Sequence, residues 1–223
     1  AWAGLHLGSN HPLWSLSYEA AFYLIFFAAV YLRGWRRILL LAALCLAAGL
    51  NVMLLFPAWA LGVAARHLVE RDRGAALCAT LFVASAVIYY LSNSAQFDMV
   101  VLWFTREISG GNPYALYRHS AEYQWSAMIA LLAAIHIIAA GPALRLVPDA
   151  ALRWIERPVR WLAGASFSIY AIHYPFLMLI ATALPKDVSL AERLLLQGGG
   201  ALALCLVFAA VFERPLPHLR ARL

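Results

Sequence analysis

The sequence is poor in charged residues, which make up only 13% of its 223 positions, whereas 64% are hydrophobic and the mean hydropathy is +0.75. Soluble domains are about one-quarter charged, so this composition excludes a water-soluble globular domain. No polar stretch is long enough to fold as a separate soluble domain, and no repeat recurs at a fixed period. We therefore predict a single membrane domain over residues 1–223.

Lysine, paired cysteines and metal-binding spacings are scarce as well. The only lysine, Lys186, falls in a loop, which excludes a retinal protein because its Schiff base needs a lysine inside a helix. The 3 cysteines lie in apolar runs without CxxC spacing and are expected to be small buried side chains. No HxxxH or HExxH spacing occurs, so we expect no metal site and no bound cofactor.

Long apolar runs are what the sequence has instead. A bilayer core about 30 Å thick needs roughly 20 apolar residues per helix. Runs near that length cover residues 12–32, 38–56, 58–68, 75–91, 123–140, 161–184 and 190–212. The third is short and is expected to pair with its predecessor across Pro57, because proline interrupts helical hydrogen bonding. These runs predict an all-α, polytopic integral membrane bundle of about seven transmembrane segments.

The arginines alternate along the chain in a way that predicts topology. If every run crosses, one side receives the segments 33–37, 66–73, 145–160 and 214–222 with most of the arginines. The other side receives only Arg106, Arg118, Lys186 and Arg193. Because arginine is enriched in cytoplasmic loops, we expect the chain to start outside and to end in the cytoplasm. The net charge of +6 therefore reflects topology rather than nucleic-acid binding.

Glu19 is a carboxylate inside the first apolar run. An ionised acid at mid-helix costs about 2.5–3.5 kcal/mol on insertion scales, so it is expected to face a cavity or a partner. Ser15 and Tyr23 lie four residues to either side and share its helix face. A structural hydrogen bond between helices is the alternative reading. Trp14, nearby, could equally belong to an aromatic belt at the membrane surface.

A second polar stripe lies in the sixth run, where Ser166, Tyr170 and His173 fall on one helix face. Pro175 has no backbone N–H and cannot donate to the carbonyl of Ala171, which should leave a free acceptor beside the imidazole. A structural histidine is the alternative to a functional one. His136, in the fifth run, has no polar neighbour at helical spacing and is assigned to packing.

Three segments together resemble the acyltransferase-3 family of polytopic membrane O-acyltransferases. Residues 10–19, with the sequence NHPLWSLSYE, are similar to the family's N-x-x-x-W-S-L-x-x-E signature, although a plain helix cap would also explain Asn10. Residues 165–175, ASFSIYAIHYP, are similar to its S-Y-S-I-Y-L-I-H-x-P segment. Glu213 and Pro215 with Arg222 look like its terminal E-x-P motif and basic tail.

The resemblance implies transfer of an acyl group, expected to be acetyl, from acyl-coenzyme A to a hydroxyl of a carbohydrate or cell-surface polymer such as lipopolysaccharide. It implies Glu19 as a catalytic residue and a bacterial inner-membrane location. The substrate-binding candidates are Asn10, Trp14, Ser15, Tyr170 and His173. A transporter or flippase of a glycan or lipid-linked substrate is the alternative class.

The family's basic-plus-histidine motif on its first helix has no counterpart in this sequence. The resemblance therefore covers the C-terminal two-thirds of such a domain, and the catalytic base is expected to precede residue 1. On that reading, residues 1–223 alone would be folded but inactive.

Overall fold

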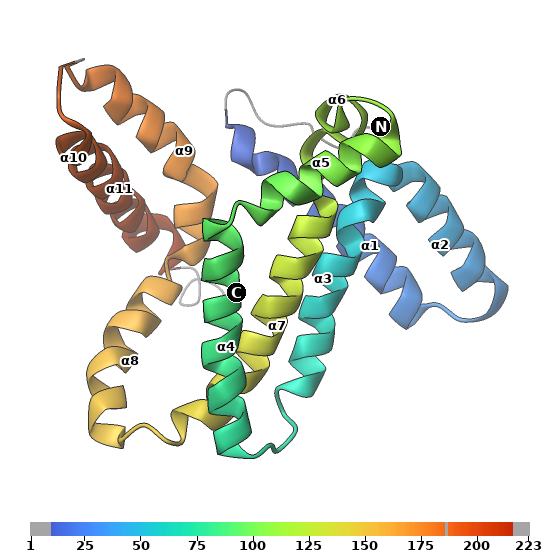
Figure 1. Cartoon of the computed structure of the whole chain (residues 1–223), viewed down its shortest axis with the longest axis horizontal. Helices are drawn as coiled ribbons and strands as arrows, with labels where there is room; N and C mark the ends of the chain where they lie inside the picture. Colours follow the sequence, from blue (N-terminus) through green and yellow to red (C-terminus); the bar gives the residue numbers. More distant parts are fainter. Residues whose placement is uncertain (1–9, 186, 216–223) are drawn as a thin grey trace. The chain divides into compact units, whose positions relative to one another are not determined.

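The computed structural model of the chain describes residues 10–185 and 187–215, and within these residues all regular structure is helical, with no strand. This confirms the all-α class. Among the described residues, five helical segments are long and apolar enough to cross a membrane, and the number is six if the bent pair α2 and α3 counts as one span. The chain therefore has the architecture of a polytopic membrane protein (Figure 1).

The described residues divide into two compact units, one of residues 16–148 and the other of residues 10–15, 149–185 and 187–215. The expectation of a single membrane domain stays a prediction.

The first unit is built around α7. It contains most of α1 (Trp14–Tyr31), then α2 (Gly34–Ala48), α3 (Leu50–Leu68), α4 (Ala75–Ser94), α5 (Phe97–Ser109), α6 (Pro113–Tyr117), η2 (Arg118–Ser120) and α7 (Tyr123–Leu144). α7 packs along both α3 and α4 (Figure 1). Cys78, Ala139 and Ala143 form a buried cluster between α4 and α7. Small side chains at this contact let the two helix backbones approach closely, which is how membrane helices gain packing energy.

The helix boundary expected at Pro57 is wrong. Pro57 lies inside α3, and the chain instead turns at Gly49, where its direction bends by 115° from α2 to α3. Gly49 has φ 79° and ψ 170°, a conformation that is open essentially only to glycine. The physical reason is that α3 tolerates a missing N–H within its length, whereas a sharp turn needs a backbone angle that only glycine adopts at little cost.

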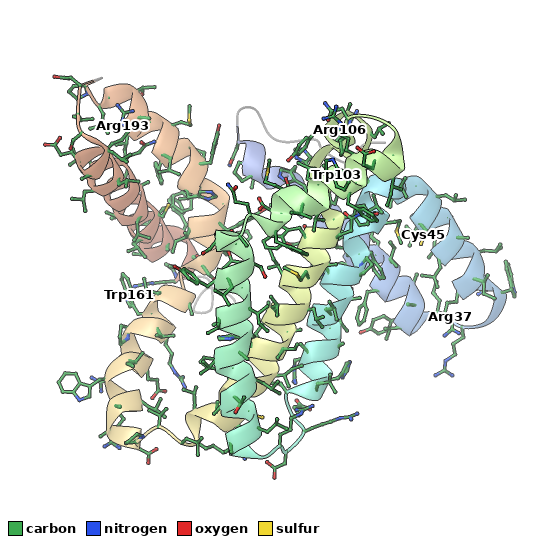
Figure 2. All side chains as sticks on the ribbon, in the orientation of Figure 1. Arg37, Cys45, Trp103, Arg106, Trp161 and Arg193 are labelled. Carbon is green, nitrogen blue, oxygen red and sulfur yellow. The ribbon has the colours of Figure 1, made fainter. Side chains whose placement is uncertain are left out.

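The V-shaped pair brings the arginine-rich segments of the first unit to the same end. The α1–α2 and α3–α4 connections lie away from the corner at Gly49, while α5 and α6 lie near it (Figure 1). Figure 2 shows Arg37 and Arg106 at these two different ends. Arg145, after α7, donates from Nη1 to Asp72 Oδ1 in the α3–α4 connection over 2.9 Å. This guanidinium holds the pKa of the Asp72 carboxyl below its usual value.

The second unit contains η1 (His11–Leu13), α8 (Asp149–Ala163), α9 (Ser166–Ala183) and a long helical run. That run consists of α10 (Leu190–Arg193), the π-helical segment η3 (Leu194–Gly199), α11 (Gly200–Phe208) and the π-helical segment η4 (Ala209–Glu213). α9 packs against α11. A Cβ on Gly200 would lie 3.0 Å from Ile180 Cδ1, and Gln197 donates to the Leu177 carbonyl over 3.1 Å. Glycine and a side-chain amide thus hold these two helices together.

Candidate functional site

Asn10 satisfies the carbonyl that Pro175 leaves free. Its Nδ2 donates to the Ala171 carbonyl over 2.8 Å. In a regular helix the N–H of residue 175 would bind that oxygen, but proline has none. The predicted free acceptor therefore exists, and a side chain 161 positions away in the sequence occupies it. Because Nδ2 is fixed by this bond, Asn10 Oδ1 points elsewhere; it is buried and has no hydrogen-bond partner among the residues described.

Tyr170 joins the same segment to α9. Its hydroxyl donates to the Pro12 carbonyl over 2.9 Å, and the Ser15 hydroxyl makes a short hydrogen bond to the Tyr170 oxygen. Ser15 and Tyr170 were both candidates from the sequence, in separate motifs. The structure brings them into direct contact. Asn10, Ser15 and Tyr170 together form a polar cluster that fixes the residues before α1 against the middle of α9.

His173 lies one turn from this cluster on α9 and is half-buried. Its Nδ1 is 3.0 Å from the Ile169 carbonyl and 2.9 Å from the Tyr170 carbonyl, so the ring donates from Nδ1 to its own helix. A neutral imidazole that donates from Nδ1 carries its lone pair on Nε2. No residue described by the structure hydrogen-bonds to Nε2. His173 therefore offers an acceptor, and its local bonds determine which nitrogen that is.

Glu213 and Arg214 anchor the end of the last helical run to the two ends of the α8–α9 junction. Glu213 Oε2 accepts a hydrogen bond from the Ser168 backbone N–H over 2.9 Å. Ser168 lies in the first turn of α9, and the N-cap residue, Ala165, makes no side-chain hydrogen bond that would cap this helix. A carboxylate at a helix N-terminus satisfies a free donor and complements the helix dipole. Arg214 donates to the Trp161 carbonyl over 3.2 Å and lies 4.1 Å from the centre of its ring.

These contacts explain Glu213 of the terminal motif and Arg214, which fills its variable position, and leave Pro215 and Arg222 open. Pro215 lies two residues after the end of η4 and is half-buried. Arg222, the basic residue predicted with them, lies outside the described residues.

Glu19 belongs to the first unit and is half-buried on α1. No hydrogen bond or ion pair holds its carboxylate among the residues that the structure describes. One turn further along α1, Phe22 packs against Phe56 and Trp59, with ring centres 5.6 and 5.8 Å apart. The expected structural partner from another helix is therefore absent from the described chain, and an apolar, aromatic surface lies beside the acid.

Trp14, the other candidate at this end of α1, is half-buried. Since it precedes Ser15, it belongs to the second unit, whereas Glu19 belongs to the first. The sequence motif from Asn10 to Glu19 thus includes η1 and the start of α1, with Asn10, Trp14 and Ser15 in the second unit and Glu19 in the first.

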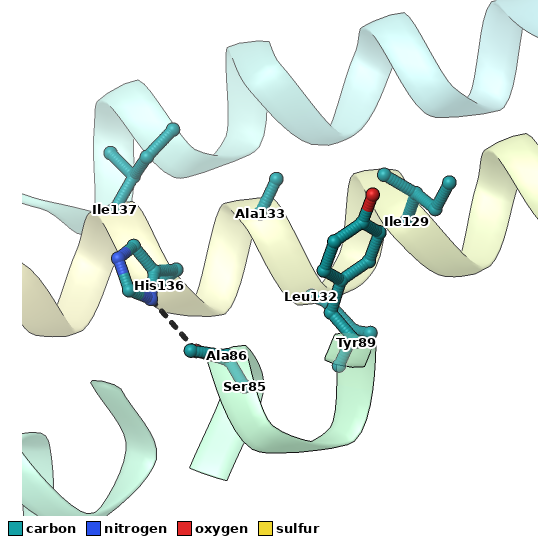
Figure 3. A pocket seen from close by; sticks show the side chains of 8 residues that line it. All are labelled: Ser85, Ala86, Tyr89, Ile129, Leu132, Ala133, His136 and Ile137. Atoms are coloured by element: carbon teal, nitrogen blue, oxygen red, sulfur yellow. Dashed lines mark hydrogen bonds between the residues drawn. The ribbon is translucent and has the colours of Figure 1, made fainter. Parts of the chain in front are cut away.

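A separate pocket of about 340 Å³ lies between α4 and α7 (Figure 3). Its polar members are Ser85, His136 and Tyr89, and the Ser85 hydroxyl lies 3.0 Å from His136 Nδ1. His136 also stacks on Phe82, with ring centres 3.9 Å apart. The contact to Ser85 was missed from the sequence, because the two residues lie on different helices. It agrees with a packing role for His136, since its Nδ1 is hydrogen-bonded within the unit.

Long apolar helices, and a polar cluster at the carbonyl that Pro175 leaves free in α9, define this molecule as a polytopic membrane protein with a polar site. The acyltransferase-3 family model, described as an acyltransferase domain, matches residues 1–213. The chain belongs to this family and is a membrane acyltransferase. No curated protein and no solved structure matches it.

Proposed function

We propose that this acyltransferase moves an acyl group, acetyl as the simplest case, from acyl-coenzyme A to a hydroxyl of a carbohydrate or cell-surface polymer. The observation that carries the proposal is Glu19. It is a half-buried carboxylate without a partner in the described chain, on a helix that is apolar enough to cross a membrane. Such a group is costly in a bilayer unless it serves a ligand or a reaction.

The reaction forms an ester bond and breaks a thioester bond. The acceptor oxygen attacks the thioester carbonyl carbon, its proton passes to a base, and coenzyme A leaves as the thiol. A base near the hydroxyl and donors for the developing oxyanion each commonly contribute about two or more orders of magnitude in rate. We assign Glu19 the task of orienting the acceptor hydroxyl or the catalytic group, because a carboxylate accepts hydrogen bonds from both.

The polar cluster of the second unit supplies acceptors of its own. Asn10 Oδ1 and His173 Nε2 both lack a partner in the described chain, and both accept hydrogen bonds. A sugar presents several hydroxyl donors, so this pair suits the acceptor substrate. Ser15 and Tyr170 then act as positioning residues, since their hydroxyls are already bonded to each other and to the Pro12 carbonyl. We assign Trp14 to the same substrate region from its place in the motif.

For localisation, we propose the bacterial inner membrane, with the start of the chain outside and its end in the cytoplasm. The support is the arginine distribution in the sequence. This orientation gives the acyl-coenzyme A donor access from the cytoplasm and the glycan acceptor access from outside.

The test is Glu19→Gln in the intact, membrane-embedded enzyme, which includes the segment expected to carry the catalytic base, with acetyl-coenzyme A dependent acylation of cell-envelope glycan as the readout. The substitution keeps the shape and removes the charge, so we expect turnover to fall by about 10²-fold, the effect of losing orientation at a reacting group, at unchanged expression. The matched control is Glu107→Gln on the exposed surface of α5, which should retain activity. An active Glu19→Gln variant would refute the orienting role. Substrate transport into liposomes without any acylation would favour the flippase class instead.

A further inference from the structure

α8 connects two membrane spans but cannot be a span itself. It follows α7 and precedes α9, both of which lie in segments long and apolar enough to cross. α8 has 15 residues and carries Arg153, Arg157 and Arg160 together with Asp149 and Glu156. It is too short and too charged to enter the hydrocarbon core. Since both of its ends are tied to spans through short connections, α8 must lie at a membrane surface.

The two faces of α8 differ completely in character. At about 100° per residue, all of its charged side chains fall within roughly one-third of the helix circumference. The opposite face is entirely apolar and includes Trp154, Ile155, Pro158, Val159 and Leu162. No residue of α8 is buried, and Trp154 is 85% exposed. The apolar face therefore has no partner within the described part of the second unit.

Two arginines on the charged face are left without a counter-ion. Glu156 is paired with Arg160, at 2.8 Å between Oε1 and Nη2. Arg153 and Arg157 have no hydrogen bond or ion pair among the described residues, and they lie four residues apart on one face, where like charges repel. Together with Trp154, Glu156 and Pro158 they line a hollow of about 570 Å³. An anion placed between the two guanidinium groups would relieve the repulsion and accept hydrogen bonds from both.

We propose that α8 lies in the plane of the membrane surface and that Arg153 and Arg157 bind the phosphate of an anionic phospholipid. The occupant is a lipid rather than a soluble anion, because Arg157 lies at the edge of the charged face and Trp154 begins the apolar face beside it. Arginine on the polar face with tryptophan and aliphatic residues on the other is the pattern of helices that bury one face in the headgroup region. The flanking spans keep the site at the height of lipid phosphates.

The first test measures the depth of α8 in the intact chain, reconstituted in nanodiscs of phosphatidylcholine and phosphatidylglycerol. Spin labels are attached to Ile155→Cys and Glu156→Cys in a Cys45→Ala background, in which the remaining Cys78 and Cys205 are fully buried. We expect the label at 155 to contact lipid-soluble oxygen and the label at 156 to contact a water-soluble nickel complex. Equal access of the nickel complex to both positions would overturn the in-plane placement.

The second test measures lipid preference. A fluorophore on Ala150→Cys is quenched by trace nitroxide-labelled phosphatidylglycerol or phosphatidylcholine, and the ratio of the two quenching constants reports local enrichment. Removing one arginine near an anionic surface lowers the enrichment about fivefold, the factor that corresponds to about 1 kcal/mol. Arg153→Gln with Arg157→Gln should therefore abolish most of the preference, and Arg153→Lys with Arg157→Lys should retain most of it.

The matched control is Arg106→Gln with Arg118→Gln, which removes the same charge from other elements and should leave the ratio at α8 unchanged. A ratio near one in the unsubstituted chain would overturn the lipid site. The same conclusion would follow if the control pair lowered the ratio as much as the α8 pair.

Discussion

Two polar residues in this apolar chain form hydrogen bonds with backbone groups that the helices leave unsatisfied. Asn10 donates to the Ala171 carbonyl, and Glu213 accepts from the Ser168 N–H. Unpaired backbone groups are costly where water is absent, so each of these bonds has a structural purpose. Glu19 differs, because no described group satisfies its carboxylate.

The cap on α9 can be tested at the residue scale. Glu213→Ala removes the acceptor of the buried Ser168 N–H, so we expect a loss of about 1.5–3 kcal/mol, the contribution of a hydrogen bond to a charged group. Hydrogen exchange in the first turn of α9 should accelerate accordingly. Glu213→Gln keeps an acceptor oxygen and should lose less.

The control for this cap is Glu156→Ala, which breaks the exposed pair with Arg160 and should cost about 0–1 kcal/mol. Unchanged exchange at Ser168 in Glu213→Ala would show that the N-terminus of α9 does not depend on the carboxylate.

At the scale of elements, two helices contain a proline, a residue that ordinarily interrupts a helix. α9 continues through Pro175 because a side chain from before α1 supplies the missing donor. α3 continues through Pro57, and the turn lies at Gly49. Proline therefore marks a gap in hydrogen bonding in this chain, whereas a positive-φ glycine marks the change in direction.

A double-mutant cycle tests whether α9 depends on the hydrogen bond from Asn10 to the Ala171 carbonyl. Asn10→Ala should cost about 1–3 kcal/mol, since it leaves the Ala171 carbonyl without a donor. Pro175→Ala restores an N–H to that carbonyl, so Asn10→Ala should cost clearly less in that background, with a coupling of about 0.5 kcal/mol or more. Unfolding midpoints in detergent provide the measurement. Asn112→Ala, which uncaps α6, is the control and should be additive with Pro175→Ala. Additivity for Asn10 as well would contradict the assigned bond.

The turn between α2 and α3 gives a second prediction at this scale. Gly49→Ala forces an alanine to φ 79°, and we expect a loss of about 1–3 kcal/mol in stability. The matched control is Gly62→Ala within α3, where no atom lies within 4 Å of the new Cβ and alanine favours the helix. The midpoint of thermal unfolding should therefore fall in Gly49→Ala and rise in Gly62→Ala. An equal, small effect for both would show that the corner does not rely on glycine.

At the scale of the whole molecule, the arrangement of the arginines and the geometry of the first unit lead to one topology. The V of α2 and α3 returns the chain to the end from which it came, so the connections before α2 and after α3 share an end (Figure 1). Cysteine labelling in intact and permeabilised cells measures this. We expect Arg37→Cys, Arg71→Cys and Asp149→Cys to react only from the cytoplasm and Ser109→Cys to react from outside. Labels at positions 37 and 71 on opposite sides would make α2 and α3 a single crossing.

Composition and the apolar runs determine the fold class and the positions of most spans, and the resemblance of three sequence motifs indicates the family. The apolar runs at 75–91 and 123–140 reappear as α4 and α7 because about 20 apolar residues in lipid have no alternative to a helix. The free carbonyl at Ala171 also follows from the sequence, since proline lacks an N–H wherever it stands. Local rules of this kind need no knowledge of neighbouring helices.

Tertiary structure alone decided which side chains meet. Nothing in the sequence indicates that Asn10 reaches Ala171, that Glu213 caps α9, or that Ser85 binds His136, because each pair joins helices far apart in the chain. The turn at Gly49 was likewise missed, since glycine permits many conformations and only packing selects one of them. Hydrogen bonds between helices depend on three-dimensional distance, and spacing along one helix carries no information about it.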